Sequence, residues 1–367
     1  MAPDNPLVRL GALGQSPWYD FITRDLIATG ELRALISQDG LLGMTSNPTI
    51  FEKAIAGSED YDDDIRRLAA EGYAAEAIFE ALAIADVRAA CDAFQGVYAA
   101  TDGADGLVSL EVSPTLARDA AATEAAARRL WAAVARPNLM IKIPGTVEGL
   151  AAIERCIADG INVNVTLLFS VARHEAVMEA YLAGLERRVQ AGQRLDRVAS
   201  VASFFVSRVD TKVDPALDAA GRPELRGTVA IANAGLAYAA FERTFAGARW
   251  EALAARGARV QRPLWASTST KDPRLPDVHY VEALVAPRTV NTLPPETFAA
   301  YRDHGNPAVR IAEAVATAPA RLAALAAAGI DLDVVTRELE AEGVEKFAAS
   351  FRSLLAGIDA KAGALAG

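Results

Sequence analysis

Residues 138–143 read NLMIKI, and residues 161–166 read INVNVT. Both are short runs of apolar and β-branched residues, as expected of buried β-strands. Between them, residues 146–158 place apolar side chains at helical spacing, and Gly160 follows where that helix should end. A strand, a helix and a second strand in this order predict a parallel β-α-β unit.

The same alternation runs along the rest of the chain. Helical stretches such as 115–135 and 227–246 separate further strand candidates, and Thr115 is expected to cap the first of these helices. The eight predicted strands are 16–20, 41–45, 107–112, 138–143, 161–166, 198–203, 262–267 and 285–291. Eight strands alternating with helices predict an α/β fold, a closed (β/α)8 barrel of the TIM type with additional helices.

An open, doubly wound parallel sheet is the alternative architecture. Its usual nucleotide-binding signatures are missing, because no GxGxxG follows the first strand and no GxxxxGK[ST] occurs in the sequence. The first strand candidate, 16–20, is the weakest, since Trp-Tyr-Asp-Phe-Ile could also open a helix. We therefore favour the barrel.

Three segments lie outside the simple alternation. Residues 1–15 are interpreted as a short N-terminal arm, and residues 307–362 as extra C-terminal helices. The span 49–106 should hold two or more helices, with the acidic run 59–64 at a solvated helix start. No linker and no internal repeat is visible, so residues 1–367 are predicted to form a single domain.

The charge balance excludes several classes of protein. The chain of 367 residues is 52% hydrophobic and 23% charged, which is not the composition of a disordered chain. Its formal net charge is −10, which disfavours nucleic acids and anionic membrane surfaces as partners. If an anionic substrate binds, a few local cations must hold it.

Cysteine and histidine are too scarce for a disulfide framework or a histidine-rich metal site. The cysteines are Cys91 and Cys156, and the histidines are His174, His279 and His304. The first residues lack the apolar core of a secretion signal, and no run of 18 apolar residues occurs. The sequence therefore predicts a soluble cytoplasmic protein without a disulfide framework or a histidine-rich metal site.

Lys142 stands out because it lies inside the apolar run Leu139–Pro144, in a chain with only six lysines. Burying an ammonium group without a partner is expensive, and complete burial lowers a lysine pKa by up to about 3–5 units. A neutral amine can attack a ketone and form a Schiff base. The alternative is a structural lysine that reaches solvent from a strand end or pairs with a carboxylate.

Polar residues also stand at or just after the carboxyl ends of the other predicted strands, and in a barrel these ends converge on one mouth. They are Asp20, Asn47, Glu111, Asn164, Thr166, Ser203 and Arg208. With a lysine they suit carbonyl chemistry: a carboxylate moves protons, amides and hydroxyls hold substrate hydroxyls, and arginine binds phosphate. Each alone also has a structural explanation, such as a helix cap at Asp20, an Asx turn at Asn47, a surface ion pair at Glu111 or packing at Ser203.

Several of these residues lie in motifs that resemble the transaldolase family. The matching segments are GMTSNPTIF (43–51), MIKIP (140–144), GINVNVTLLFS (160–170), SFFVSRVD (203–210), WASTSTK (265–271) and TVNTLP (289–294). They follow in order over roughly residues 16–355, and the chain is most similar to the longer bacterial type. The resemblance implies an α/β barrel that needs no metal and no organic cofactor.

The resemblance implies four catalytic residues. Lys142 matches the lysine that forms a Schiff base with the ketose donor, and Asp20 matches the aspartate that takes the proton from the donor's C4 hydroxyl. Glu111 matches the glutamate that moves protons with a bound water, and Thr166 matches the threonine that holds this water.

It also implies how the substrate is held. Asn47, Asn164 and Ser203 match residues that hydrogen-bond the dihydroxyacetone unit, and Arg208 matches a phosphate-binding arginine. The implied reaction belongs to the non-oxidative pentose phosphate pathway. It transfers dihydroxyacetone from sedoheptulose 7-phosphate or fructose 6-phosphate to glyceraldehyde 3-phosphate or erythrose 4-phosphate. The sequence leaves open whether the protein is a homodimer or a monomer.

Two positions depart from relatives. Shorter bacterial members carry a second phosphate-binding arginine where this chain has Ser269, and we expect Lys271 to supply that charge, unless it is only a solvent-exposed lysine. Related fructose-6-phosphate aldolases place a tyrosine where this chain has Phe205, which favours transfer over hydrolytic release of dihydroxyacetone. A barrel that binds sugar phosphates or scaffolds other enzymes without turnover is the remaining alternative.

Overall fold

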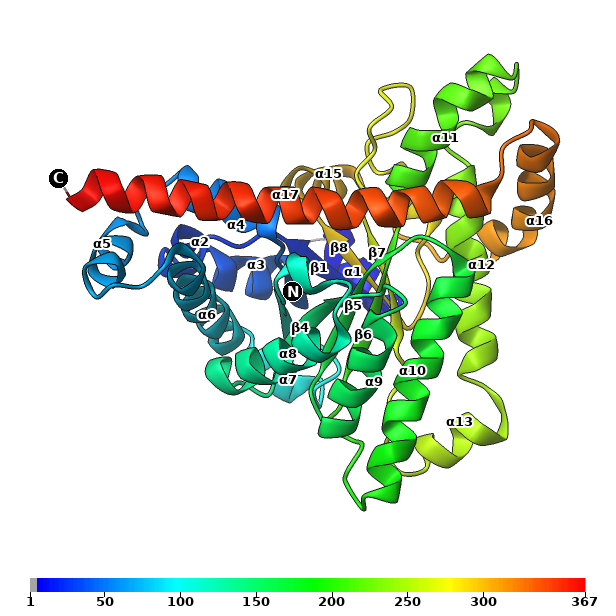
Figure 1. The fold of residues 1–367 in the computed structure, drawn as a ribbon. Helices are drawn as coiled ribbons and strands as arrows, with labels where there is room; N and C mark the ends of the chain where they lie inside the picture. Colours follow the sequence, from blue (N-terminus) through cyan, green and yellow to red (C-terminus); the bar gives the residue numbers. More distant parts are fainter. Residues whose placement is uncertain (1–4, 367) are drawn as a thin grey trace.

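The computed structural model describes residues 5–366, and its centre is a closed barrel of eight parallel strands in sequence order (Figure 1). The predicted barrel is therefore confirmed. The strands are β1 (Gln15–Asp20), β2 (Gly43–Thr45), β3 (Leu107–Glu111), β4 (Leu139–Pro144), β5 (Val163–Leu168), β6 (Ser200–Phe205), β7 (Arg262–Ala266) and β8 (Thr289–Leu293).

Helices cover the outside of the barrel and follow the strands in alternation (Figure 1). Before and around the first three strands lie α1 (Pro6–Ala12), α2 (Arg24–Ala28), α3 (Glu31–Asp39), α4 (Pro48–Ala56), α5 (Asp62–Ala70), α6 (Ala75–Ala93) and α7 (Gln95–Ala100). The middle of the chain adds η1 (Pro114–Leu116), α8 (Ala120–Val134), α9 (Gly149–Asp159), α10 (Val171–Gln190), α11 (Ser207–Ala219) and η2 (Pro223–Leu225). The rest are α12 (Val229–Thr244), α13 (Gly247–Ala254), α14 (His279–Ala283), α15 (Pro295–His304), α16 (Ile311–Ala327) and α17 (Leu332–Ala366).

The N-terminal segment is not the arm that the sequence predicts. Its described part forms helix α1, and Gln15 already belongs to β1; the first four residues of the predicted arm lie outside the described residues. The Asn5 side chain accepts a hydrogen bond from the Leu7 amide and so caps α1. Leu7 and Leu10 are fully buried, so burial of this apolar face anchors the segment.

Several other boundaries differ from prediction, and two of them have a clear local reason. Thr115 does not cap the following helix, because residues 114–116 form a 3-10 turn and the Asp119 side chain accepts from the Ala122 amide at the start of α8. A carboxylate is favoured there by the positive end of the helix dipole. β8 begins at Thr289, later than predicted, because Pro287 has no amide hydrogen and Arg288 has a positive φ of 58°.

β5 carries an irregularity beside the barrel mouth. Its pairing with β6 shifts between Val165 and Leu168, and Leu167 within this bulge has a φ of 63°. A bulge re-aims the side chains next to it and is common beside active sites, and a left-handed leucine is strained. The bulge directly follows Thr166, one of the predicted catalytic residues.

The long helix α17 lies across one end of the barrel, over the carboxyl ends of the strands (Figure 1). A Cβ atom at Gly343 would lie 3.0 Å from the Leu167 side chain, so this glycine permits a close approach between α17 and the β5 bulge. Lys361, near the end of α17, donates to the Ile55 carbonyl and pairs with Asp62. These contacts fix α17 above the mouth.

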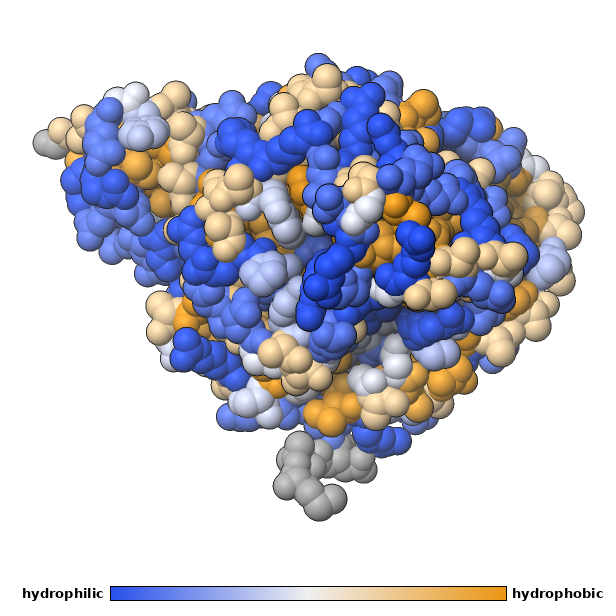
Figure 2. Space-filling model, turned by 90° about the horizontal axis from the view of Figure 1, so that it is seen from below, coloured by the Kyte–Doolittle hydropathy of each residue, from blue (hydrophilic) through white to orange (hydrophobic). Residues whose placement is uncertain are grey.

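One face of the molecule is mostly polar. Viewed from below the orientation of Figure 1, hydrophilic residues cover most of the face and apolar residues lie in scattered groups (Figure 2). In residues 5–366, no single helix is long and apolar enough to cross a membrane. Helices α16 and α17, which are bent by 91° against each other, reach the necessary length and apolar composition only when they are taken together.

Candidate active site

Lys142 lies inside the barrel with its side chain only 6% exposed. The register of β4 places it directly beside Glu111 of β3 and Asn164 of β5. Its Nζ lies 3.0 Å from Glu111 Oε2 and donates a hydrogen bond of 3.0 Å to the Ser46 carbonyl. The ammonium is therefore held by a buried carboxylate rather than by solvent.

Glu111 is the last residue of β3, and its side chain is 3% exposed. Burial raises the pKa of this carboxyl, and the neighbouring Lys142 charge opposes the rise. Its Oε1 has no hydrogen-bond partner among the described residues, and neither has the buried Oγ1 of Thr166. Buried polar atoms without a protein partner are costly, so both are available to bind water or substrate.

Asp20 ends β1 on the other side of the mouth. Its Oδ1 accepts a 2.7 Å hydrogen bond from Thr45 Oγ1, which lies 2.6 Å from Thr292 Oγ1. Burial raises the pKa of Asp20, while the Lys142 charge and the Thr45 hydrogen bond lower it. A carboxyl with a raised pKa beside a lysine can accept and return a proton near neutral pH.

Asn164, the register partner of Lys142 on β5, lies close to Ser203 of β6. Ser203 Oγ donates to Asn164 Oδ1 at 2.7 Å, and Asn164 Nδ2 donates to Ser109 Oγ at 2.9 Å. Ser203 lines the mouth cavity, whereas Asn164 is fully buried and does not. Asn164 is thus placed to orient Ser203.

Asn47 lines the same cavity from the start of α4. Its Oδ1 accepts from the Ile50 amide at 3.0 Å and caps the helix, followed by Pro48 at the first helical position. The structural explanation and the binding role are compatible, because capping uses the oxygen and leaves the Nδ2 donors for a ligand.

A cavity of about 2120 Å³ opens at the carboxyl ends of the strands. Seven of the nine predicted site residues line it, namely Asp20, Asn47, Lys142, Thr166, Ser203, Arg208 and Lys271. The other two, Glu111 and Asn164, do not line it but contact Lys142 and Ser203, which do. Phe205 and the buried Ser269 line it as well.

The cavity gathers most of the lysines of an acidic protein, together with Asp20, Glu296 and Glu342. Five of the six lysines line it, namely Lys53, Lys142, Lys212, Lys271 and Lys346. Arg208 lies with its guanidinium 4.9 Å from the Phe205 ring, near the start of α11. Lys271 is exposed in the loop after β7, on the same rim. A mouth with this charge attracts anions to a chain whose net charge is −10.

Sequence reasoning missed several residues of the site. Thr45 donates a hydrogen bond to Asp20, and Thr292 lies within hydrogen-bond distance of Thr45. Both are polar residues near strand ends, inside the segments 43–51 and 289–294 quoted from the sequence. Phe347, whose ring centre lies 5.5 Å from Lys142 Nζ, comes from α17 and carries no sequence signal of its own. In residues 5–366 no group of three or more histidine, cysteine or acidic side chains is placed to hold a metal ion.

Comparisons with known proteins show which family the sequence matches. A family model described as Transaldolase/Fructose-6-phosphate aldolase matches residues 17–358. A curated protein named Transaldolase, from Acidothermus cellulolyticus, is 56% identical over 359 residues, which cover 96% of each chain. The Transaldolase of Thermobifida fusca is 52% identical over 355 residues, again 96% of each chain, and Transaldolase 2 of Nostoc sp. is 46% identical over 97% of each. The match covers every residue of the site described above.

Proposed function

We propose that this chain, which belongs to the transaldolase/fructose-6-phosphate aldolase family and is a transferase of the transaldolase type, transfers a dihydroxyacetone unit through a Schiff base on Lys142. The donors are sedoheptulose 7-phosphate or fructose 6-phosphate. The acceptors are glyceraldehyde 3-phosphate or erythrose 4-phosphate. The buried pair of Lys142 and Glu111, 3.0 Å apart beside the mouth cavity, is the observation that carries the proposal.

Lys142 Nζ attacks the C2 carbonyl of the donor once it has lost its proton. The C–N bond forms, and the carbonyl oxygen becomes a hydroxyl. Glu111, beside Nζ, then gives a proton to this hydroxyl, which leaves as water while the nitrogen lone pair completes the C=N bond. Thr166 holds the water with Glu111, as their free oxygen atoms allow.

Asp20 takes the proton of the C4 hydroxyl, and the C3–C4 bond breaks. The electrons of that bond move into the iminium and give an enamine, and the aldose leaves. The second aldose then accepts the enamine carbon, with Asp20 returning the proton to the new hydroxyl. Hydrolysis of the new imine frees the product and restores Lys142.

Asn47, Asn164 and Ser203 hold the hydroxyls of the dihydroxyacetone unit, Asn164 through Ser203. Arg208 and Lys271 bind the phosphate at the rim. Phe205 lines the cavity and has no group that could hydrogen-bond a water molecule. This supports transfer of the three-carbon unit to an aldose over its release by water, which would require protonation of the enamine and hydrolysis of the resulting imine.

The setting of the reaction is part of the same proposal. The enzyme works in the cytoplasm on sugar phosphates, as one domain, with no metal, organic cofactor, nucleic acid or membrane as partner, and as a monomer or a homodimer. It serves the non-oxidative pentose phosphate pathway.

Borohydride reduction in the presence of fructose 6-phosphate tests the proposal, with Lys142→Ala as the control. Mass spectrometry should find a dihydroxyacetone-derived or ketose-derived adduct on Lys142 and none on the variant. Addition of erythrose 4-phosphate should lower the dihydroxyacetone adduct and give sedoheptulose 7-phosphate. A folded wild-type protein without any adduct would overturn the proposal.

A further inference from the structure

Phe347 of the long helix α17 lies beside the nucleophile of the proposed reaction. Lys142 Nζ stands over the face of the Phe347 ring, 5.5 Å from its centre. Phe347 lines the mouth cavity and is nevertheless only 4% exposed. Glu111 and the Ser46 carbonyl hold the same nitrogen from the barrel strands, so Phe347 is the group that meets it from the helix lying across the mouth (Figure 1).

The packing of α17 fixes this ring on both sides. One turn before it, a Cβ atom at Gly343 would lie 3.0 Å from the Leu167 side chain of the β5 bulge. One turn after it, Thr49 of α4 donates a 2.9 Å hydrogen bond to Ser350. The backbone of α17 therefore cannot leave the mouth at Phe347 without losing one of these contacts.

The ring continues an apolar surface that begins in the barrel. Phe205 of β6 lines the same cavity, and its ring centre lies 5.2 Å from that of Phe169. A Cβ atom at Gly343 would in turn lie 3.6 Å from the Phe169 ring. A buried water molecule needs two or more polar partners, and these rings supply none. Water is therefore poorly held on this side of Lys142.

We propose that Phe347 is a specificity-determining residue, which protects the enamine intermediate from water until an acceptor aldose arrives. This inference rests on the proposed function. In the enamine the reacting carbon, C3, is two bonds from Nζ, roughly 2.5 Å away, so it lies beside the same ring. The acceptor is anchored through its phosphate at Arg208 and displaces water as it enters, whereas a lone water molecule has no such anchor.

The loss that Phe347 opposes begins with a proton on C3. The C=C electrons of the enamine form the new C–H bond, and the nitrogen lone pair completes an iminium. Water then adds to C2 and returns one proton, and cleavage of the C–N bond frees dihydroxyacetone and Lys142. One water is consumed, and nothing is oxidised or reduced. Productive turnover hydrolyses the ketose imine in the same way but never protonates C3, so a cover at C3 slows the loss without slowing product release.

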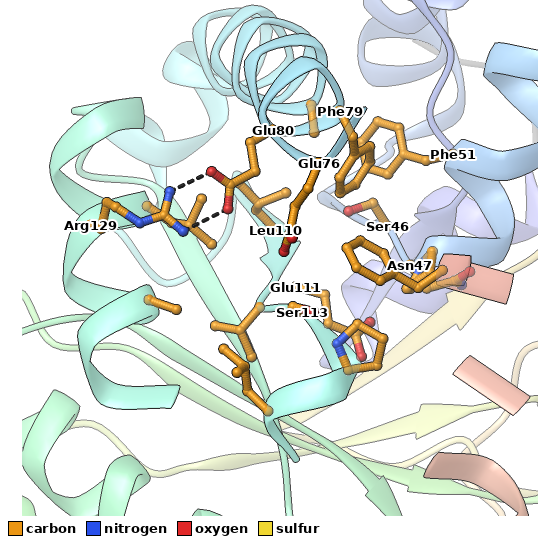
Figure 3. A pocket seen from close by; sticks show the side chains of 18 residues that line it. Ser46, Asn47, Phe51, Glu76, Phe79, Glu80, Leu110, Glu111, Ser113 and Arg129 are labelled. Carbon is orange, nitrogen blue, oxygen red and sulfur yellow. Dashed lines mark hydrogen bonds and ion pairs between the residues drawn. The ribbon is translucent and has the colours of Figure 1, made fainter. Parts of the chain in front are cut away.

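Two variants remove the cover, and one matched variant leaves it in place. Phe347→Ala opens the space beside C3, and Phe347→Leu opens part of it and serves if the alanine variant does not fold. Phe351→Leu is the control, because Phe351 lies one turn later on α17 and is 3% exposed. It lines a second hollow, outside the barrel between α4, α6 and α8, where its ring centre is 5.6 Å from that of Phe79 (Figure 3).

The measurement uses fructose 6-phosphate without an acceptor, while a dehydrogenase removes glyceraldehyde 3-phosphate so that the intermediate cannot return. The initial burst of glyceraldehyde 3-phosphate counts the intermediates formed, and the later steady release of dihydroxyacetone gives their rate of loss per site. We expect this rate to rise at least about tenfold in Phe347→Ala and about threefold in Phe347→Leu, with no change in Phe351→Leu. Transfer to erythrose 4-phosphate, assayed in parallel, should change less than the rate of loss does.

The outcomes separate this inference from the function on which it rests. An unchanged rate of loss in a folded Phe347 variant would overturn the inference. An equal rise in Phe351→Leu would also overturn it, because the effect would then come from a loosened α17 and not from the cover. A wild-type enzyme that gives neither burst nor transfer would contradict the proposed function, and this inference with it.

Discussion

The two ends of the barrel bury polar groups in opposite ways. At the amino end, Asp105 accepts hydrogen bonds from Ser16 Oγ and Trp18 Nε1 and pairs with Arg262 at 2.8 Å. Asn162 donates to two carbonyls, and its Oδ1 accepts from the Ala199 amide. Both oxygens of Asp105 and both ends of the Asn162 amide are therefore used by the protein.

At the carboxyl end, buried oxygen atoms are left free. Glu111 Oε1 and Thr166 Oγ1 have no hydrogen-bond partner among the described residues. A protein that only needed stability would satisfy them, since each unpaired buried polar atom costs about 1–3 kcal/mol. Gln261 Oε1, just before β7 at the amino end, is also buried without a hydrogen-bond partner among the described residues, so the contrast lies in free oxygen atoms placed beside a buried lysine, which distinguishes the end proposed for chemistry.

The largest effect is expected for Lys142→Ala. Loss of the nucleophile should lower kcat/KM at least ~10³-fold, because Lys142 is the buried lysine beside Glu111 on which the proposed Schiff base forms. Lys361→Ala is the matched control, since Lys361 pairs with Asp62 away from the cavity. Steady-state transfer assays measure both. Equal activity in the two variants would place the chemistry elsewhere.

Asp20→Asn should separate bond cleavage from imine formation. The amide cannot take the C4 proton, so kcat should fall by about 10²–10⁴-fold. Borohydride should still trap the protein, now as the adduct of the intact ketose. A trapped three-carbon unit in this variant at the wild-type level would show that Asp20 is not the base.

Asp210 tests this comparison, because it lies near the carboxyl end of the barrel and yet both of its carboxyl oxygens accept hydrogen bonds from the protein. Its oxygens accept from the Ala230 amide at 2.7 Å and Tyr280 Oη at 3.0 Å. Burial raises its pKa from 3.8 to about 7. The folded chain therefore binds more protons than the unfolded chain between about pH 4 and 7, and the free energy of unfolding falls as pH rises through this window.

Asp210→Asn should remove that contribution, which amounts to about 4 kcal/mol between pH 4 and pH 8. Denaturant unfolding of both proteins at a series of pH values measures it. The wild type should lose stability relative to the variant as pH rises, while kcat at pH 7 changes little. An unchanged pH dependence would show that Asp210 is ionised throughout.

The smallest effect is expected for Lys271→Ala. The exposed Lys271 should contribute roughly 1 kcal/mol to phosphate binding, so KM for fructose 6-phosphate should rise by about 3–10-fold. Unphosphorylated fructose, assayed in parallel, should show no change. An unaltered KM for the phosphorylated donor would make Lys271 a solvent-exposed residue only.

Periodicity and motif spacing predicted the barrel, its eight strands and the meeting of Lys142 with Glu111. Strands β3 and β4 follow each other in the sequence and pair in parallel, and their register places Glu111 directly beside Lys142. Phe347 could not be predicted, because its place depends on how α17 packs over the mouth. The Leu167 bulge and the Asp119 cap depend on competition between local conformations, which composition does not resolve.

The central contrast is tested most directly by two isosteric changes, Glu111→Gln at one end and Asp105→Asn at the other, each measured for kcat and for Tm. We expect Glu111→Gln to lower kcat about 10²–10⁴-fold. Tm should fall as well, because the buried Lys142 loses its charged partner. Asp105→Asn leaves Arg262 without its charged partner and should cost about 1–3 kcal/mol of stability, with kcat nearly unchanged. Loss of activity from Asp105→Asn, or loss of stability alone from Glu111→Gln, would contradict the account.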